Sequence, residues 1–322
     1  MYDVVALGEL LVDFGEVPAA DGVLQFAANP GGAPCNVLSL LSRHHRRTAF
    51  IGRVGEDLLG RYLTDTIRQL GIDVSGVTAD PDVRTTLAFV ATDASGERSF
   101  SFFRNPGADC CLSVEDVPFS MIAECRIFHF GTLSMTHESA RAATTAAIRE
   151  AKKAGALLSF DPNYRAPLWP SEDLARAQMA YGCSVCDVLK IERSELTFLT
   201  GITSETEAVK TLFCQYPVRF IAVTAGADGA SLYTRCVAVH RQAVPVSPVV
   251  DTTGAGDAFW GVCLDRLLDH GPEQWTKASL EELLTRACTG ASLVIQKKGA
   301  LSVMPTKAEI DSAIAEAGRK IT

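Results

Sequence analysis

The most informative stretch of this sequence is DTTGAGDAF, residues 251–259. Its small residues allow several backbone N–H groups to turn toward one point, and the apolar spacing of residues 259–268 predicts a helix that begins there. A helix N-terminus binds anions because its first amides lack partners and the helix dipole is positive at that end. Asp257 would lie beside this cradle, which suits phosphoryl transfer to a hydroxyl. The structural alternative is that Asp257 only caps the helix.

Composition limits the class of protein. The chain has 322 residues, 47% hydrophobic and 21% charged, as in an ordinary globular protein. Its net charge of −8 argues against a nucleic-acid partner, because no basic stripe is available to neutralise phosphates. A signal peptide, a lipidation motif and an apolar run of the ~20 residues that span a bilayer are all missing. We therefore expect a cytoplasmic protein with no membrane partner.

The ten cysteines are scattered through apolar segments, which predicts reduced, buried thiols. Cys183 and Cys186 form a Cys-x-x-Cys pair. A zinc site would need a second pair or histidines at ligand spacing, and neither follows. We predict structural thiols.

Short apolar strands alternate with helices along the chain. Strand-like runs occupy residues 4–12, 49–51, 127–130, 157–160, 188–191 and 220–224, and helix-like runs include 58–70 and 138–154. This rhythm predicts an α/β fold with a mainly parallel sheet covered on both faces. Ligands of such sheets collect at the carboxyl ends of the strands. The candidate functional residues expected there are Asp13, Asp161, Glu192, Glu195 and Gly226.

Two stretches break the rhythm. Residues 14–30 show no helical period, and 85–93 with 99–103 predict a hairpin around 94–97. Both fit a small β-sheet packed outside the main domain, whose open face would need a partner or a ligand to cover it.

Residues 251–259 resemble the C-terminal signature of the PfkB-type (ribokinase-like) sugar kinases. GGAPCN, residues 31–36, resembles that family's N-terminal signature, and the likeness covers essentially all 322 residues as a single domain. It implies a three-layer α/β/α fold with a small β lid, built from segments 13–35 and 84–111, that closes over the sugar and forms a homodimer contact. Within the family, the chain is most similar to bacterial- and plant-type fructokinases. That implies transfer of phosphate from ATP to D-fructose, giving fructose 6-phosphate, with Asp257 as general base and the amides of Gly254, Ala255 and Gly256 as anion hole.

The resemblance also implies a set of sugar-binding residues: Asp13, Gly31, Gly32, Asn36, Arg104, Asn105 and Asp257. Asp13 ends the first predicted strand, where its carboxylate can accept two hydroxyl hydrogen bonds; the alternative is a turn-initiating Asp. The two glycines permit close backbone approach to the sugar. Asn36 can both donate and accept, and it could also cap a helix over residues 37–41.

The phosphate side is matched more loosely. Arg165, in an Asp-x-Asn-x-Arg stretch, would contact substrate or the transferring phosphate, the alternative being a surface ion pair. Glu195 matches the Glu of the family's Asn-x-x-Glu and implies Mg²⁺ held through water, whereas Glu192 replaces the Asn and adds negative charge beside the triphosphate. Asp251 and Thr253 match a monovalent-cation site, so K⁺ is a further expectation. The residues implied to border ATP are Lys190, Glu192, Thr224, Gly226, Gly229, Gly254 and Gly256.

Two other functions stay open at this point. One is a family kinase for 2-keto-3-deoxygluconate, ribose or a nucleoside, since Arg104 and Arg165 would also suit a carboxylate substrate. The other is a non-catalytic subunit with this fold, which the intact Gly254–Asp257 element argues against and Glu192 keeps open. No P-loop motif occurs, and no Gly-x-Gly-x-x-Gly follows the first strand, so P-loop kinases and Rossmann dehydrogenases are unsupported.

Overall fold

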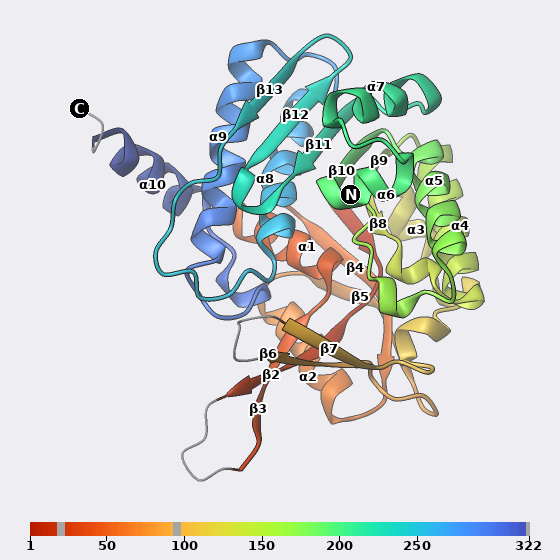
Figure 1. The fold of residues 1–322 in the computed structure, drawn as a ribbon. Helices are drawn as coiled ribbons and strands as arrows, with labels where there is room; N and C mark the ends of the chain where they lie inside the picture. Colours follow the sequence, from red (N-terminus) through yellow and green to blue (C-terminus); the bar gives the residue numbers. More distant parts are fainter. Residues whose placement is uncertain (18–22, 93–97, 320–322) are drawn as a thin grey trace.

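The computed structural model describes residues 1–17, 23–92 and 98–319, without the side chains of residues 90–92 and 98–100. Its main sheet runs in the order β13-β12-β11-β10-β9-β8-β1-β4-β5 (Figure 1). Every neighbouring pair is parallel except β11–β12 and β12–β13. The strands are β1 (Tyr2–Leu7), β4 (Thr48–Gly55), β5 (Asp73–Asp80), β8 (Cys125–Gly131), β9 (Leu157–Asp161), β10 (Val188–Glu192), β11 (Phe220–Thr224), β12 (Ala230–Thr234) and β13 (Ala238–Arg241).

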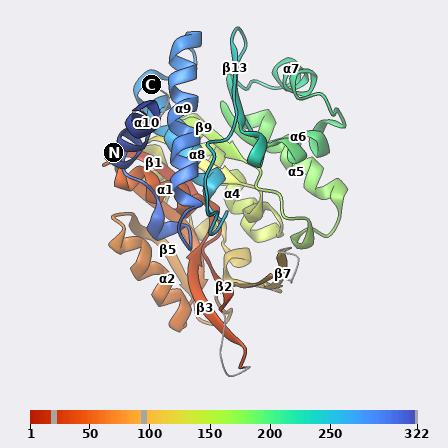
Figure 2. The same ribbon diagram turned by 60° about the vertical axis from the view of Figure 1, so that its left-hand side comes forward.

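Helices cover both faces of this sheet (Figures 1 and 2). One face packs against α1 (Ala33–Arg43), α2 (Leu58–Gln69), α8 (Ala255–His270), α9 (Lys277–Val294) and α10 (Lys307–Arg319). The other packs against α3 (Phe119–Ala123), α4 (Glu138–Lys153), α5 (Glu172–Val185), α6 (Arg193–Thr200) and α7 (Glu205–Gln215). Alternate residues of β1 serve the two cores, because successive side chains of a strand point to opposite faces: Val4 and Ala6 join the first, Val5 and Leu7 the second. The three-layer α/β/α arrangement predicted from the sequence is confirmed.

A second, four-stranded sheet has the order β3-β2-β6-β7. Its strands are β2 (Leu11–Val17), β3 (Gln25–Gly31), β6 (Leu87–Thr92) and β7 (Arg98–Phe103), drawn from the two segments expected to form the small sheet. β6 and β7 pair antiparallel, as the hairpin prediction requires, while its turn at 94–97 lies outside the described residues. Phe14, Phe26, Phe89 and Phe103 pack together, with Phe14 stacked on Phe89 at 5.0 Å between ring centroids.

Two sequence predictions about local structure are wrong. The apolar run 4–12 is not one strand but β1 and the start of β2, which belong to different sheets. The pattern hid the break because Leu10 and Val12 are as buried as the residues of β1. The helix predicted over 37–41 begins at Ala33 with Gly32 as its N-cap, so Asn36 lies inside the first turn and does not cap it.

All ten cysteines are free thiols, and seven of them are buried, including Cys183 and Cys186. Across the described ranges, no helix combines the length and the apolar character that crossing a membrane demands.

Candidate active site

The nonapeptide 251–259 forms the entry to α8. Gly254 is the N-cap, with φ 80° and ψ −1°, a left-handed conformation that glycine adopts without strain. A Cβ at this position would lie 2.6 Å from Cβ of Ala300. Asp257 is the third residue of the helix, so the alternative that it caps the helix is wrong, and its carboxylate is available to the site.

Asp257 is held by α1. Nδ2 of Asn36 donates a 2.7 Å hydrogen bond to its Oδ2. Asn36 is only 4% exposed, and its Oδ1 finds no hydrogen-bond partner among the described residues. Burial and the charge of Asp161 raise the pKa of Asp257 to about 6, against the opposing effects of Lys190, Asn36 and Arg165. A carboxyl with a pKa near the working pH suits a general base.

The sugar-side residues come from the small sheet and its junction with α1. Asp13 lies within β2, opposite Asn29 of β3, and not at the end of a main-sheet strand as expected. Burial raises the pKa of Asp13 to about 6, with Arg165 opposing this and Asp251 adding to it. Any Cβ on Gly31 would overlap Oδ2 of Asp13. The carboxylate therefore rests directly on the glycine loop.

Gly32 makes the second half of that loop. Its φ is 136°, and a Cβ there would overlap the carbonyl oxygen of Glu9. Both glycines are thus required by close packing against protein groups, and the predicted close approach of their backbone to a sugar stays a prediction.

Arg104 is placed differently from the other predicted sugar ligands. It is 6% exposed, and its three nitrogens point to protein groups: Nε to Oδ2 of Asp109 at 2.8 Å, Nη1 to Oγ1 of Thr136 at 2.8 Å and Nη2 to the carbonyl of Leu133 at 2.9 Å. These bonds join the base of β7 to the segment after β8. They give no support to a sugar contact, whereas the neighbouring Asn105 is exposed.

Lys190 lies beneath the first turn of α8. Its Nζ is 3.0 Å from Oδ2 of Asp161, and a Cβ on Gly256 would lie 3.3 Å from the same Nζ. Burial opposes its charge, but the carboxylates of Asp161, Glu195 and Asp257 raise the pKa of Lys190 and keep it protonated. Lys190, predicted to border ATP, is therefore a buried member of an ion pair.

Glu195 is buried at 5% exposure and already accepts two backbone hydrogen bonds. Oε1 accepts from the amide of Tyr164 at 2.6 Å, and Oε2 from the amide of Glu192 at 2.9 Å. Burial raises its pKa. Glu192 is the N-cap residue of α6 and is exposed, so its extra negative charge faces water.

The predicted nucleotide loop follows β11. Thr224 ends that strand beside Glu192 of β10, and Gly226 has φ 55° with open space around its Cβ position. Gly229 has φ 95°, and a Cβ there would overlap the carbonyl oxygen of Arg241. The backbone at Gly226 is therefore open, whereas that at Gly229 is packed against the segment after β13.

Asp251 ties two loops together. Its Oδ1 accepts from the amide and hydroxyl of Thr253 at 2.9 and 2.7 Å, and its Oδ2 accepts from the amide of Gly299 at 3.2 Å. The charge of the exposed Arg165 lowers the pKa of both Asp13 and Asp257, opposing the effect of burial.

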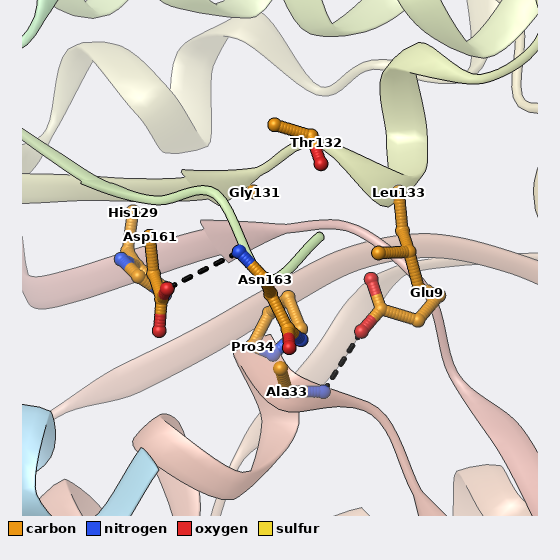
Figure 3. Close-up of a pocket in the computed structure, with 9 residues that line it drawn as sticks. All are labelled: Glu9, Ala33, Pro34, His129, Gly131, Thr132, Leu133, Asp161 and Asn163. Atoms are coloured by element: carbon orange, nitrogen blue, oxygen red, sulfur yellow. Dashed lines mark hydrogen bonds between the residues drawn. The ribbon is translucent and has the colours of Figure 1, made fainter. Parts of the chain in front are cut away.

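Sequence reasoning missed a small cavity behind this site (Figure 3). Glu9 lines it, with Oε1 accepting from the amide of Ala33 at 2.8 Å, and burial raises the pKa of Glu9 to about 7. Asn163, at φ 46°, donates its amide to Oδ1 of Asp161 at 3.3 Å. His129 also faces it, and burial lowers its pKa to about 4. The sequence signal that could have indicated a functional role for Glu9 was its charge within the apolar run 4–12.

Known proteins resemble this chain over nearly its whole length. Residues 1–307 match the pfkB family of carbohydrate kinases. Fructokinase-1 of Zea mays is 40% identical over 314 residues, covering 95% of this chain and 96% of its own. The fructokinase of Xylella fastidiosa with bound ATP has a TM-score of 0.89 at 31% identity, over 99% of this chain and 100% of its own.

A fructokinase of Vibrio cholerae O395, solved in a form with fructose, ADP and calcium, has a TM-score of 0.85 at 32% identity, over 97% of this chain and 98% of its own. The chain belongs to the pfkB family of carbohydrate kinases. It has the ribokinase-like fold and is a carbohydrate kinase, as the two signatures indicated.

Proposed function

We propose that this kinase is a fructokinase that transfers the γ-phosphoryl group of ATP to the 6-hydroxyl of D-fructose. The observation that carries the proposal is the position of Asp257: a carboxylate with a pKa of about 6, in the first turn of a helix entered through Gly254. Its similarity to fructokinases over nearly the whole chain supports fructose as the sugar.

Fructose would bind between the small sheet and the α8 entrance. Asp13 would accept hydrogen bonds from two hydroxyls, and the Gly31–Gly32 backbone would pack against the ring. The buried Oδ1 of Asn36 needs a donor, because an unsatisfied buried acceptor costs about 1–3 kcal/mol. A sugar hydroxyl supplies one.

In the reaction, Asp257 accepts the proton of the 6-hydroxyl, while the oxygen of that hydroxyl attacks the γ-phosphorus. The new O–P bond forms as the bond from that phosphorus to the bridging oxygen breaks, and ADP leaves with the electron pair. The first-turn amides of α8 at Gly254, Ala255 and Gly256 stabilise the charge on the transferring group. Arg165 would add its positive charge beside the same group. Water exclusion by the small sheet would limit ATP hydrolysis.

The donors fit a water-held Mg²⁺ next to the phosphates. Both oxygens of Glu195 already accept backbone hydrogen bonds, which leaves them lone pairs for bound waters more readily than for direct coordination. When bound, the ion neutralises charge on the ATP phosphates, beside the exposed Glu192. For K⁺, the proposed position is the loop that Asp251 and Thr253 close.

The small sheet is our proposed homodimer contact. Its aromatic cluster includes Phe103, which is 64% exposed, and an apolar face of this kind is favoured as an interface. The cytoplasmic location stays a prediction.

A coupled ADP-release assay with Mg-ATP tests the substrate. Fructose, 2-keto-3-deoxygluconate, ribose, glucose, mannose and adenosine would be compared. We expect a strong preference for fructose. A preference for 2-keto-3-deoxygluconate would leave the proposed mechanism intact and would replace fructose as the proposed substrate. ATP binding without turnover on any acceptor would favour the non-catalytic subunit and point to Glu192.

A further inference from the structure

The ion pair of Lys190 and Asp161 has no role in the reaction described above, yet it lies under the catalytic helix turn. Nζ of Lys190 is 3.0 Å from Oδ2 and 3.2 Å from Oδ1 of Asp161, and both side chains are more than nine-tenths buried. The ammonium packs against Gly256, the residue before Asp257. It therefore supports the backbone that presents the base.

Stability alone explains this pair poorly. Desolvation costs several kcal/mol per buried ion, and apolar residues of similar volume are often as stable or more so. The pair is also close enough to Asp257 for both of its charges to act on that carboxyl. An ion pair that is costly to bury and adjacent to a titrating carboxylate is better explained by what it does to that carboxylate.

We propose that Lys190 and Asp161 are positioning residues for the general base: Lys190 supports the helix turn that presents Asp257 and favours its carboxylate form, and Asp161 holds Lys190 in place. The inference rests on the proposed role of Asp257. The charged and polar groups that face Asp257 are Asp161 from β9, Lys190 from β10, Asn36 from α1 and Arg165 from the segment after β9. Glu195 of α6 acts on Lys190.

The two charges push in opposite directions. After burial, the charge of Asp161 is the largest cause of the raised pKa of Asp257, and that of Lys190 is the largest opposing one. Removing the ammonium should therefore leave Asp257 protonated up to a higher pH. Removing the Asp161 charge should keep it ionised down to a lower pH. When both charges are removed, the two shifts in the pKa of Asp257 should largely cancel.

Three variants test this: Lys190→Met, Asp161→Asn and the double variant. The acid limb of kcat/KM against pH would be measured for each, together with the titration of the Asp257 carboxyl by ¹³C NMR, assigned with Asp257→Asn. We expect the limb to move up by about one pH unit in Lys190→Met and down by about one unit in Asp161→Asn. The double variant should lie within about half a unit of the wild type.

The proposal would be overturned if the acid limbs of the two single variants stay in place or move in the same direction. The ion pair would then have a structural role only, seen as a change in Tm. If Lys190→Met does not fold because Asp161 is left buried without its partner, Asp161→Asn still decides, because the carboxylates of Glu195 and Asp257 continue to favour the charged form of Lys190. The NMR titration needs no substrate. A wild type inactive on every sugar would therefore count against the proposed function and not against this inference.

Discussion

The Arg104–Asp109 and Lys190–Asp161 pairs are both buried, but only the first has all its hydrogen bonds satisfied within the protein. The nitrogens of Arg104 all find acceptors, and Asp109 also accepts from the hydroxyl of Thr86. Around the second pair, by contrast, Oδ2 of Asp161 and Oδ1 of Asn36 have no well-aligned hydrogen bond from any described residue.

Buried polar groups in folded proteins are normally satisfied, so the exceptions need an explanation. A closed cluster marks a structural joint, here the base of β6 and β7. An open cluster marks a place that a ligand completes. The difference separates the residues that hold the small sheet from those that we propose to act on the sugar.

Asp257→Asn should have the largest effect on the open cluster. Without a base, kcat should fall by about 10²–10⁴-fold, while sugar binding survives. Steady-state kinetics with fructose binding by calorimetry would measure both. Tm at pH 7 should not drop, because the change removes a buried charge. Near-normal turnover would remove Asp257 from its role.

Arg104→Met should damage the closed cluster. Leaving Asp109 buried without its partner should cost about 3–5 kcal/mol of unfolding free energy, measured by urea titration. The exposed Arg68, in a surface pair with Asp65, provides the control: Arg68→Met should cost about 0.5 kcal/mol or less. If Arg104 binds the sugar instead, KM would rise many-fold with little change in stability.

Gly254→Ala should cost about 1–3 kcal/mol and lower kcat, because a Cβ there meets both a left-handed φ and Ala300. Gly201→Ala is the matched control. Gly201 has a similar φ of 71° with open space around it. Its variant should therefore lose stability only through the strained left-handed backbone, and it should retain kcat. Equal losses of activity in both variants would contradict the close packing at the α8 entrance.

The mildest perturbation is pH. If Asp257 is the base, it must be a carboxylate, and its pKa is about 6, so kcat/KM should fall below that pH by about tenfold per unit. The same profile for Asp13→Asn separates the two carboxyls, since the pKa of Asp13 is also about 6. A limb that moves with Asp13→Asn and not with Lys190→Met would assign it to sugar binding.

Much of the fold could be predicted from the sequence. The strand–helix rhythm gave the parallel sheet, and residues 14–30 with 85–103 gave the small one. The break between β1 and β2 could not be seen, because Leu10 and Val12 are buried in the same core as β1. The site was harder: the glycines and Asp257 followed from local backbone chemistry, whereas the burial of Arg104 did not.

The sequence by itself determined the features that depend on neighbours along the chain. Small residues before a helix open its first amides, and alternating apolar runs require covered strands, wherever they lie. Only the tertiary structure decided which charges surround Asp257. Asn36 reaches it from 221 residues away, and Asp161 and Lys190 meet because β9 and β10 are adjacent in the sheet. The order of the strands in the sheet brings these groups together, and that order cannot be predicted from the spacing of residues in the sequence.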